Sequence, residues 1–370
     1  MNQYSDETRR DGLKRTILSL CSVMSVSGFE SRSAEAIRTL LAPLFDEYRT
    51  DAVGNHLLTR RSGREGAPKI LVDAHYDEIG MMVSEICENG FLRLCSVGGI
   101  SPTILQAADV WVYGKKTLRG VITSTPPHLR GGGSDKEKLP SCEELLVDTG
   151  YSKEAIAELV SVGTPVGFAP VYGELKGEKL TGKSFDNQAC AAVALYAALS
   201  TPKEDLAGDV TVCLSAYEET SRMGGITPAV FSERPSYAMV IDVNLARVPK
   251  APKRETVPMD EGISLAVSSA TDLRLTRMSE ELCRKKEIPH CMVAAPSSTG
   301  TNSTSVQLVG RGVPVVDVGL PLKSMHTYNE VISMEDVVSL ARFVEAFISS
   351  GEIADAFGET DEVIKGDWQE

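Results

Sequence analysis

The fold is decided by the stretch Leu71-Val72-Asp73-Ala74-His75-Tyr76-Asp77-Glu78-Ile79-Gly80. Together with Ile70, its first residues form an apolar run that predicts a buried strand. The strand would end on His75, with the carboxylate of Asp77 two residues later. A metal-binding histidine usually donates its other ring N–H to a carboxylate or a carbonyl, so this order is typical of a ligand beside its orienting partner. Taken alone, a histidine after a strand is more often a solvated loop residue, and the prediction depends on whether other ligands join it.

The composition indicates a soluble globular protein of about two domains. The chain has 370 residues, of which 42% are hydrophobic and 24% are charged. Its formal net charge of −13 argues against a nucleic-acid partner, which would need a basic surface, and against binding to an anionic membrane. The eight cysteines are spread singly, without a C-x-x-C pair, and this pattern favours a reducing compartment.

The first residues of the chain predict a helix and not a targeting segment. Lys14-Arg15 precede a fairly apolar segment, but acidic residues lie upstream and serines interrupt it. Leu13, Ile17 and Leu20 have the spacing of an amphipathic helix. No run approaches the roughly 20 apolar residues that cross a bilayer. We therefore expect a cytoplasmic protein without a membrane partner.

The order of the expected elements predicts an α/β fold with an insertion. Between residue 81 and about residue 172, short strand-like segments alternate with glycine, asparagine and proline, which is typical of a small β domain, and residues 126–135 predict a glycine-rich loop. Before and after this region, strands alternate with helices. The expected strands lie within 46–60 and at 69–74, 209–216, 237–243, 262–268 and 313–318, and the expected helices at 13–24, 33–41, 187–199, 273–286 and 334–349.

This alternation predicts a mostly parallel sheet that is sandwiched by helices. We expect residues 1–80 and 175–370 to form one discontinuous catalytic domain. Residues 81–174 would form the inserted domain, which is small, β-rich and barrel-like.

Ionisable residues follow several of the expected strands, where open α/β sheets gather their ligands. Asp186 precedes an expected helix in the same half of the fold. The full set is His75, Asp77, Asp186, Glu218, Glu219, Asp242 and His326. Two histidines and several carboxylates suit two divalent ions such as zinc, with one carboxylate bridging. Each residue also has a simpler interpretation as a helix cap, a turn residue or a surface residue. We favour the metal centre, because crowding so many ionisable groups without a cation would be costly.

The pair Glu218-Glu219 adds catalytic chemistry. Neighbouring residues in an extended chain point in opposite directions, so one could bind metal while the other faces a metal-bridged water. That free carboxylate could take a proton from the water as it attacks a carbonyl that the ions polarise. The sequence has no G-x-S-x-G motif and no cysteine that stands out as a nucleophile. The pattern therefore predicts metal-assisted hydrolysis.

Several motifs spread along nearly the whole chain match one known family. They are Val26-Ser27-Gly28-Phe29-Glu30, Asp73-Ala74-His75-Tyr76-Asp77-Glu78-Ile79-Gly80, Gly98-Gly99, Pro126-Pro127-His128-Leu129, Gly182-Lys183-Ser184-Phe185-Asp186-Asn187, Glu218-Glu219, Val240-Ile241-Asp242-Val243 and Met325-His326 with Glu330. With these motifs the sequence resembles metallopeptidase family 42, the aminopeptidases that build tetrahedral dodecamers. Some members carry a glutamyl aminopeptidase or an endoglucanase label, and no pair of glycosidase carboxylates stands apart here to support the second.

The resemblance implies a role for each candidate residue. His75, Asp186 and Asp242 would hold one metal ion. Asp186, Glu219 and His326 would hold the other, so that Asp186 bridges the two. Glu218 would be the general base, and Asp77 would orient His75.

The resemblance also implies the cofactors and the partners. We expect two divalent metal ions per subunit, zinc in the first place, with cobalt or manganese as alternatives. The substrates would be peptides with a free N-terminus. The fold would resemble that of the zinc aminopeptidases, and the inserted domain would carry the contacts of a homo-oligomer, possibly a dodecamer.

The sequence departs from the family pattern beside the expected ligands. Gln188 stands where the family usually has arginine, and Asn302-Ser303 replace an Asp-Ala pair. The segment 220–225 lacks the usual Gly-Leu-Arg, and Lys323-Ser324 replace Arg-Tyr. All five expected ligands and the base are present, so we expect activity. The substrate preference is left open, because these substitutions are expected around the pocket.

The leading hypothesis is a dinuclear metal-dependent aminopeptidase. The first alternative is a related amidohydrolase or deacylase that acts on small N-acyl substrates, since the same centre would serve it. The second alternative is a catalytically impaired homologue that acts as an assembly or binding protein. The presence of Glu218 argues against this last hypothesis, because a structural metal site has no use for an unligated base.

Overall fold

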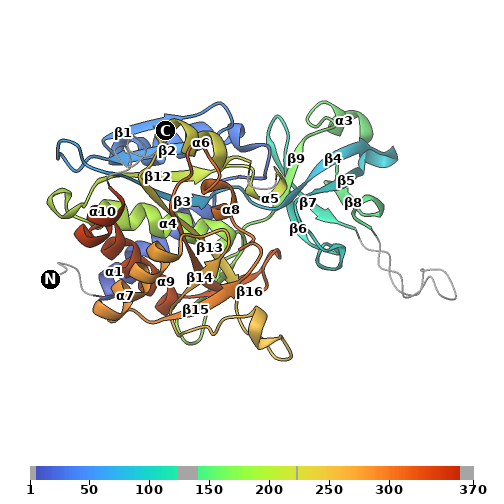
Figure 1. The fold of residues 1–370 in the computed structure, drawn as a ribbon. Coiled ribbons are helices and arrows are strands. Elements are labelled where there is room, and N and C mark those ends of the chain that lie inside the picture. The colour runs from blue at the N-terminus through green and yellow to red at the C-terminus, as the bar shows by residue number, and fades with distance from the viewer. Residues whose placement is uncertain (1–5, 124–140, 222–223, 359–370) are drawn as a thin grey trace, which may run out of the picture.

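The computed structural model describes residues 6–123, 141–221 and 224–358, which form a large α/β body and a smaller β-barrel (Figure 1). The predicted loop at 126–135 and the motif at 126–129 lie outside these residues, as does part of the segment 220–225. Within the described residues, no helix is both long and apolar enough to cross a membrane.

The large body is built on one mixed sheet. In chain order its strands are β1 (Glu47–Thr50), β2 (His56–Arg60), β3 (Lys69–His75), β10 (Gly173–Leu175), β11 (Lys179–Gly182), β12 (Asp209–Ser215), β13 (Tyr237–Leu245), β14 (Ile263–Ser268), β15 (His290–Ala295), β16 (Val315–Lys323) and β17 (Glu330–Ser333). The main path through the sheet is β1-β2-β12-β3-β13-β16-β17-β11-β10, and β14 joins it at β16, with β15 beyond.

The expectation of a mostly parallel sheet is met at the centre of the sheet and for the outer pair β14-β15. β12, β3, β13 and β16 are parallel to one another, whereas β1, β2, β17, β11 and β10 join this centre through antiparallel pairs. Chain connectivity explains three of these pairs, β1-β2, β10-β11 and β16-β17. Short connections such as residues 51–55 cannot make the long crossover that parallel neighbours require, so they produce hairpins.

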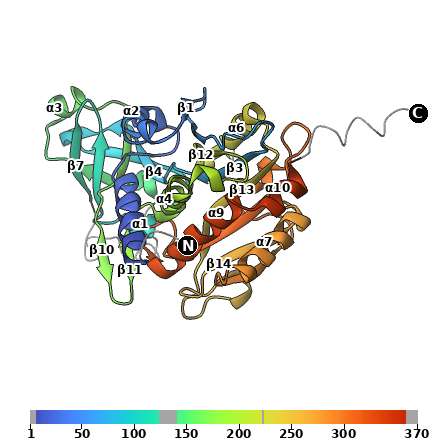
Figure 2. The same ribbon diagram turned by 90° about the vertical axis from the view of Figure 1, so that its left-hand side faces the viewer.

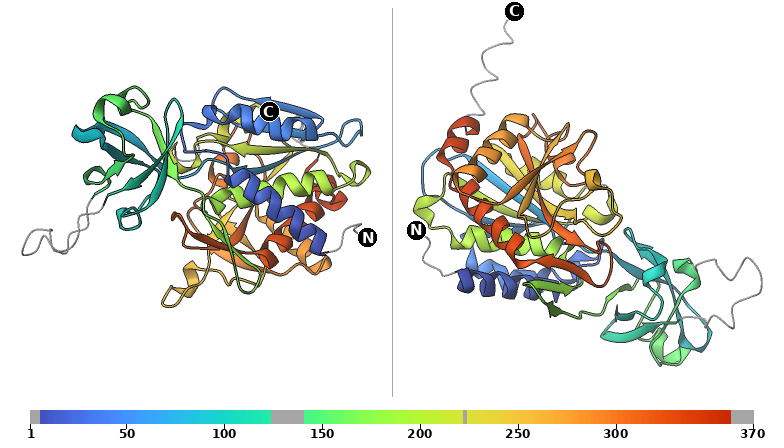
Figure 3. Two further views of the ribbon diagram at one scale, coloured as in Figure 1. Left: turned by 180° about the vertical axis from the view of Figure 1, so that it is seen from behind. Right: turned by 90° about the horizontal axis from the view of Figure 1, so that it is seen from below.

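Helices cover both faces of the sheet (Figures 2 and 3). They are α1 (Asp6–Cys21), α2 (Ala34–Leu41), α4 (Phe185–Ser200), α6 (Ile226–Glu233), α7 (Leu273–Lys285), α8 (Ser303–Val306), α9 (Met334–Ile348) and α10 (Gly351–Phe357), while the one-turn α5 (Glu218–Ser221) follows β12. One buried cluster joins α1, α4, α7 and α9 to the sheet, and a second joins α6 and α8 to its other face.

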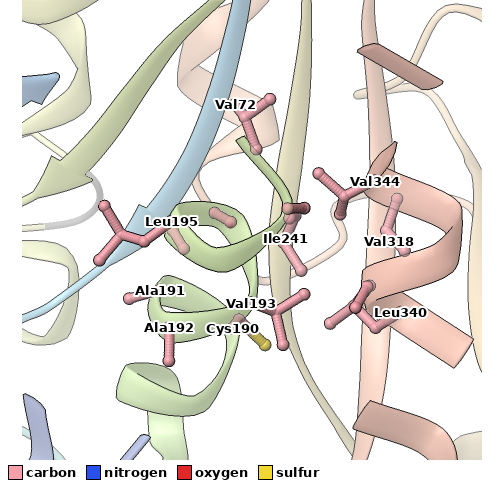
Figure 4. Packing of buried hydrophobic residues seen from close by; sticks show 14 of the residues in the cluster. Val72, Cys190, Ala191, Ala192, Val193, Leu195, Ile241, Val318, Leu340 and Val344 are labelled. Carbon is pink, nitrogen blue, oxygen red and sulfur yellow. The ribbon is translucent and has the colours of Figure 1, made fainter. Parts of the chain in front are cut away.

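Helix α4 lies at the centre of the first cluster. Its alanines let its backbone approach the sheet closely, and it packs against α1, α9 and the strands β3 and β13. Figure 4 shows part of this layer, with Val193 of α4, Ile241 of β13 and Leu340 of α9 among its buried side chains. The close packing fixes the start of α4, which carries Asp186, against the ends of the central strands.

The smaller body is a closed barrel with its own core. Its strands are β4 (Gly80–Ile86), β5 (Leu92–Val97), β6 (Asp109–Tyr113), β7 (Thr117–Ile122), β8 (Leu146–Asp148) and β9 (Pro165–Phe168), and the short helix α3 (Lys153–Ala157) lies beside them. Alternating burial along β7 places every second side chain inside. The buried residues of the barrel form a cluster that is separate from both clusters of the sheet.

Candidate metal centre

The seven residues singled out in the sequence meet at the carboxyl ends of the central strands. His75 ends β3, and Asp242 lies on β13, the next strand. Glu218 begins α5 directly after β12, and His326 lies in the turn between β16 and β17. Because β12, β3, β13 and β16 are parallel, their carboxyl ends share one edge, and side chains from distant parts of the sequence converge there.

His75, Asp186 and Asp242 form one group whose ligand atoms all lie within 4.8 Å of one another. The Nε2 atom of His75 is 3.2 Å from Oδ1 of Asp186 and 3.6 Å from Oδ1 of Asp242. All three side chains are buried.

Asp186, Glu219 and His326 form the second group, which meets the same 4.8 Å limit. The Nε2 atom of His326 is 3.4 Å from Oδ2 of Asp186 and 3.3 Å from Oε2 of Glu219. Asp186 therefore presents Oδ1 to the first histidine and Oδ2 to the second. This is the arrangement of a carboxylate that can bridge two cations.

Glu218 lies beside these groups and belongs to neither of them. Its Oε2 atom is 3.9 Å from Nε2 of His75. Burial raises the pKa of Glu218 to about 9, and the charges of Asp242 and Glu219 contribute to the rise, although His75 opposes it. A buried carboxyl group with a raised pKa can hold a proton, as a general base must during its reaction.

The expectation that the glutamate pair lies in an extended segment was wrong, because Glu218 and Glu219 begin the helix α5. Tyr217, just before them, has a φ of 59°, so the chain turns sharply at the end of β12. This turn brings both carboxylates toward the centre from the start of a helix. Sequence alone gave no signal for it, since a single turn of helix has no apolar periodicity.

Asp77 holds both His75 and the glutamate pair in place. Its main-chain oxygen lies 3.0 Å from Nδ1 of His75, while its carboxylate Oδ1 lies 3.5 Å from the same atom. The two carboxylate oxygens accept the N–H groups of Glu218 and Glu219, each at 3.1 Å. The contact to the imidazole is thus made mainly by the peptide carbonyl, and the carboxylate fixes the start of α5.

The donor atoms of the centre fit divalent cations. Four carboxylates, from Asp186, Glu218, Glu219 and Asp242, crowd around two imidazoles, and Oε1 of Glu219 is buried without a hydrogen-bond partner within the described chain. Burial raises the pKa of Glu219 to about 7, and hydrogen bonds to Asp186 and Glu219 raise the pKa of His326 to about 11. A cation bound among these groups would replace the proton that this acidic surrounding otherwise holds.

Two of the departures from the family pattern lie beneath the centre and not around a pocket. Gln188 is buried and donates through Nε2 to the main-chain oxygen of Tyr76 at 2.6 Å. Asn302 is buried and donates through Nδ2 to Asp73 at 2.8 Å and to Ser215 at 2.9 Å. For these two residues the expected place around the pocket was wrong, because a strand-end motif does not reveal which polar residues form the layer below.

Sequence reasoning also missed the polar groups that support the ligand-bearing segments. Lys183 and Glu78 form a buried ion pair, with 2.5 Å between Nζ and Oε2. Glu330 accepts the N–H groups of both Asp186 and His326. Glu78, Lys183 and Glu330 all stand in the motifs that carry the family resemblance, but the motifs alone assign them no role.

Comparison with known proteins places this centre in a family. The model of the M42 glutamyl aminopeptidase family matches residues 54–343. Lysyl aminopeptidase of Pyrococcus furiosus is 28% identical over 327 residues, which cover 87% of this chain and 93% of that protein.

Solved structures agree with this result. Aminopeptidase APDkam598 of Desulfurococcus kamchatkensis superposes with a TM-score of 0.85 at 27% identity, and the match covers 94% of this chain and 98% of that one. The TET1 peptidase of Pyrococcus horikoshii gives a TM-score of 0.79 at 25% identity and covers 91% and 99%. The chain belongs to the M42 glutamyl aminopeptidase family and, like its relatives, is a hydrolase of peptide bonds.

Proposed function

We propose that this protein is a dinuclear metal-dependent aminopeptidase. The observation that supports the proposal best is the placement of Asp186, whose Oδ1 lies 3.2 Å from Nε2 of His75 and whose Oδ2 lies 3.4 Å from Nε2 of His326. His75, Asp186 and Asp242 would hold one divalent ion, and Asp186, Glu219 and His326 the other. A ligand set of imidazole nitrogens and carboxylate oxygens suits zinc first, with cobalt or manganese as alternatives.

When bound, such ions would polarise the scissile carbonyl and lower the pKa of a water at the centre. Glu218 would take the proton of that water as the oxygen attacks the peptide carbon. The same carboxyl group would then give the proton to the leaving nitrogen as the C–N bond breaks. Asp77 would keep Glu218 and Glu219 aligned through the two N–H groups that it accepts.

The substrates that we propose are peptides with a free N-terminus. The names of the relatives support this class, because several of them are aminopeptidases. The relatives do not fix the preferred side chain, since one is named for lysine and the family model for glutamate, which carry opposite charges.

We further propose that residues 81–174 form an inserted domain that carries the contacts of a homo-oligomer. The separate core of the barrel supports its independence. The TET1 peptidase of Pyrococcus horikoshii can assemble into a tetrahedron or a large octahedral shell, and a related structure is a dodecamer. Light scattering should give a mass well above the 39.8 kDa of one chain, and a monomer at micromolar concentration would contradict the proposal.

The cytoplasm is the compartment that we propose. All eight cysteines are free, and a chain with this many cysteines and no disulfide among them is typical of a reducing compartment. When cells are extracted under denaturing conditions and the full-length protein is labelled with a thiol reagent, all eight cysteines should be modified.

The function is tested with aminoacyl anilides in the presence of Zn²⁺, Co²⁺ or Mn²⁺. The wild-type protein should cleave free-amino substrates and leave their N-acetylated forms intact. Glu218→Gln should lower kcat by about 10²–10⁴-fold, the usual contribution of a general base, while the bound metal stays at two ions per chain. Glu204→Gln, a change at an exposed carboxylate before β12, is the matched control and should leave kcat unchanged.

Three outcomes would contradict this assignment in different ways. Cleavage of the N-acetylated substrates alone would favour the amidohydrolase or deacylase. No cleavage of a full panel by a chain with two bound ions would favour a catalytically impaired assembly or binding protein. Full activity of Glu218→Gln would remove Glu218 from the role of base.

A further inference from the structure

Glu330 lies between the two segments that carry Asp186 and His326. It is the first residue of β17, and β17 pairs with β11 on one side and with β16 on the other. Strand β11 leads to Asp186, and β16 leads to His326. The Glu330 side chain is buried, with 2% of its surface exposed.

The carboxylate of Glu330 binds the main chain of both segments. Its Oε2 atom accepts the N–H of Asp186 at 3.0 Å, and its Oε1 atom accepts the N–H of His326 at 3.1 Å. Each oxygen thus holds one residue of the second group, and the rigid carboxylate fixes the distance between the two peptides.

We propose that Glu330 is a positioning residue that sets the second metal site by tying Asp186 and His326 to one carboxylate. The inference rests on the proposed function, because it assumes that Asp186, Glu219 and His326 hold an ion. Glu330 itself belongs to neither ligand group.

His326 depends on such support more than the other ligands do. Its φ is 60°, in the left-handed region that residues other than glycine adopt only at a cost. Its side chain is 34% exposed, whereas that of His75 is 2% exposed. The ring makes one further hydrogen-bond contact, between Nδ1 and the main-chain oxygen of Gly99, at 3.0 Å. The N–H bond to Glu330 therefore holds the strained turn in the conformation that aims Nε2 at the centre.

Asp186 needs the same support for a different reason. It lies in the first turn of α4, where the main-chain N–H groups have no acceptor within the helix. Glu330 supplies the acceptor. Since Asp186 belongs to both groups and His326 only to the second, loss of Glu330 disturbs two of three ligands in the second group and one of three in the first.

The test compares Glu330→Gln and Glu330→Ala with the wild-type protein. Gln keeps one acceptor oxygen and places an amide N–H₂ against the second N–H, so it preserves volume and fold but only one of the two bonds. Zinc affinity is measured by competition with a chromogenic chelator, and kcat and KM are measured across a range of free zinc. We expect the affinity for the second ion to fall about 10–100-fold, as is usual for residues that support a ligand, with a smaller effect on the first ion.

The protein offers a matched control in Asp336, six residues further along the chain. Asp336 is also a buried carboxylate that accepts two N–H groups, those of Asp260 and Gly262, each at 2.8 Å. Asp336→Asn should therefore lower the stability of the fold about as much as Glu330→Gln does, because each variant loses one acceptor for a main-chain N–H. It should leave both zinc affinities and the zinc dependence of kcat unchanged. For Glu330→Gln we expect saturating zinc to restore much of kcat.

Each result decides the proposal. Wild-type zinc affinities in both Glu330 variants, equal weakening of the two ions, or the same zinc loss in Asp336→Asn would overturn it. If the wild-type protein is active with two bound ions, any of these results would overturn only the role of Glu330 and leave the proposed function intact. A wild-type protein that binds fewer than two ions would overturn both.

Discussion

The buried ion pair between Lys183 and Glu78 gives a prediction whose size follows from the structure. Each residue is 2% exposed, and the two lie in the segments that carry Asp186 and His75. In Lys183→Met the aliphatic stem is kept and the ammonium group is removed. The Glu78 carboxylate would then remain buried without its cation.

The size of the expected loss of stability depends on the hydrogen-bond donors that remain around Glu78. Removing one partner of a buried pair costs about 3–5 kcal/mol. Here the hydroxyl of Ser184 still donates to Oε2, and the N–H of Ser25 still donates to Oε1 at 3.3 Å. Because two donors remain, we expect a loss near the lower end, about 3 kcal/mol. Replacing both residues, in Lys183→Met/Glu78→Gln, should recover about 2 kcal/mol of that loss, since no charge is left unpaired.

The assay is urea unfolding at a single protein concentration, followed by far-ultraviolet circular dichroism for the wild-type protein, the two single variants and the double variant. A Lys183→Met variant within about 1 kcal/mol of the wild type would contradict this prediction, since breaking a buried pair costs more than this. A double variant less stable than Lys183→Met would refute it as well.

Three further predictions concern the second ligand group, a buried histidine and the barrel. Gly99→Ala should lower kcat about 10–100-fold without a matching loss of stability, because its Cβ would lie 3.0 Å from Nδ1 of His326 and displace the ring. Burial lowers the pKa of His56 from 6.5 to about 4, so the unfolded chain binds a proton first as the pH falls. The free energy of unfolding should therefore fall by about 3 kcal/mol as the pH is lowered from about 6.5 to 4, and His56→Phe should abolish this fall. Leu94→Ala, in the core of the barrel, should cost about 2–5 kcal/mol and shift the fluorescence transition of Trp111 in β6 to lower urea.

Each of these predictions has its own control. Gly351→Ala, where a Cβ would meet nothing within 4 Å, should keep wild-type kcat, and an equal fall there would count against the clash at Gly99. For His56, parallel pH profiles of wild type and variant would contradict the lowered pKa. For Leu94, a simultaneous shift of the Trp111 signal and of the circular dichroism of the whole chain would show that the barrel does not unfold separately.

The strand-end residues were the part of the centre that sequence could predict. His75 and Asp242 follow or end long apolar runs, and such runs become central strands of a sheet wherever both faces are covered. The parallel centre then places their side chains on one edge. The family resemblance supplied the grouping of the ligands, because spacing along the chain does not tell which carboxylate lies between two histidines.

The rest could not be predicted, because it depends on contacts between distant segments. The strands β10 and β17 are three and four residues long, too short for a periodic pattern, and their antiparallel pairs help to make the expected parallel sheet a mixed one. Gln188 and Asn302 looked like pocket residues by their place beside ligand motifs, yet their amides donate to groups beneath the centre. Hydrogen bonds of this kind are set by the packing of the sheet against α4 and α8.

The proposed activity is the release of residues from the amino end of peptides, with Glu218 as the base. Its most direct test is mass spectrometry of a ten-residue peptide incubated with the zinc-loaded protein, beside the same peptide acetylated at its N-terminus. We expect a ladder of products shortened one residue at a time from the amino end, no change in the acetylated peptide, and no ladder with Glu218→Gln at equal zinc content. Internal cleavage, cleavage of the acetylated peptide, or an unchanged ladder with Glu218→Gln would contradict it.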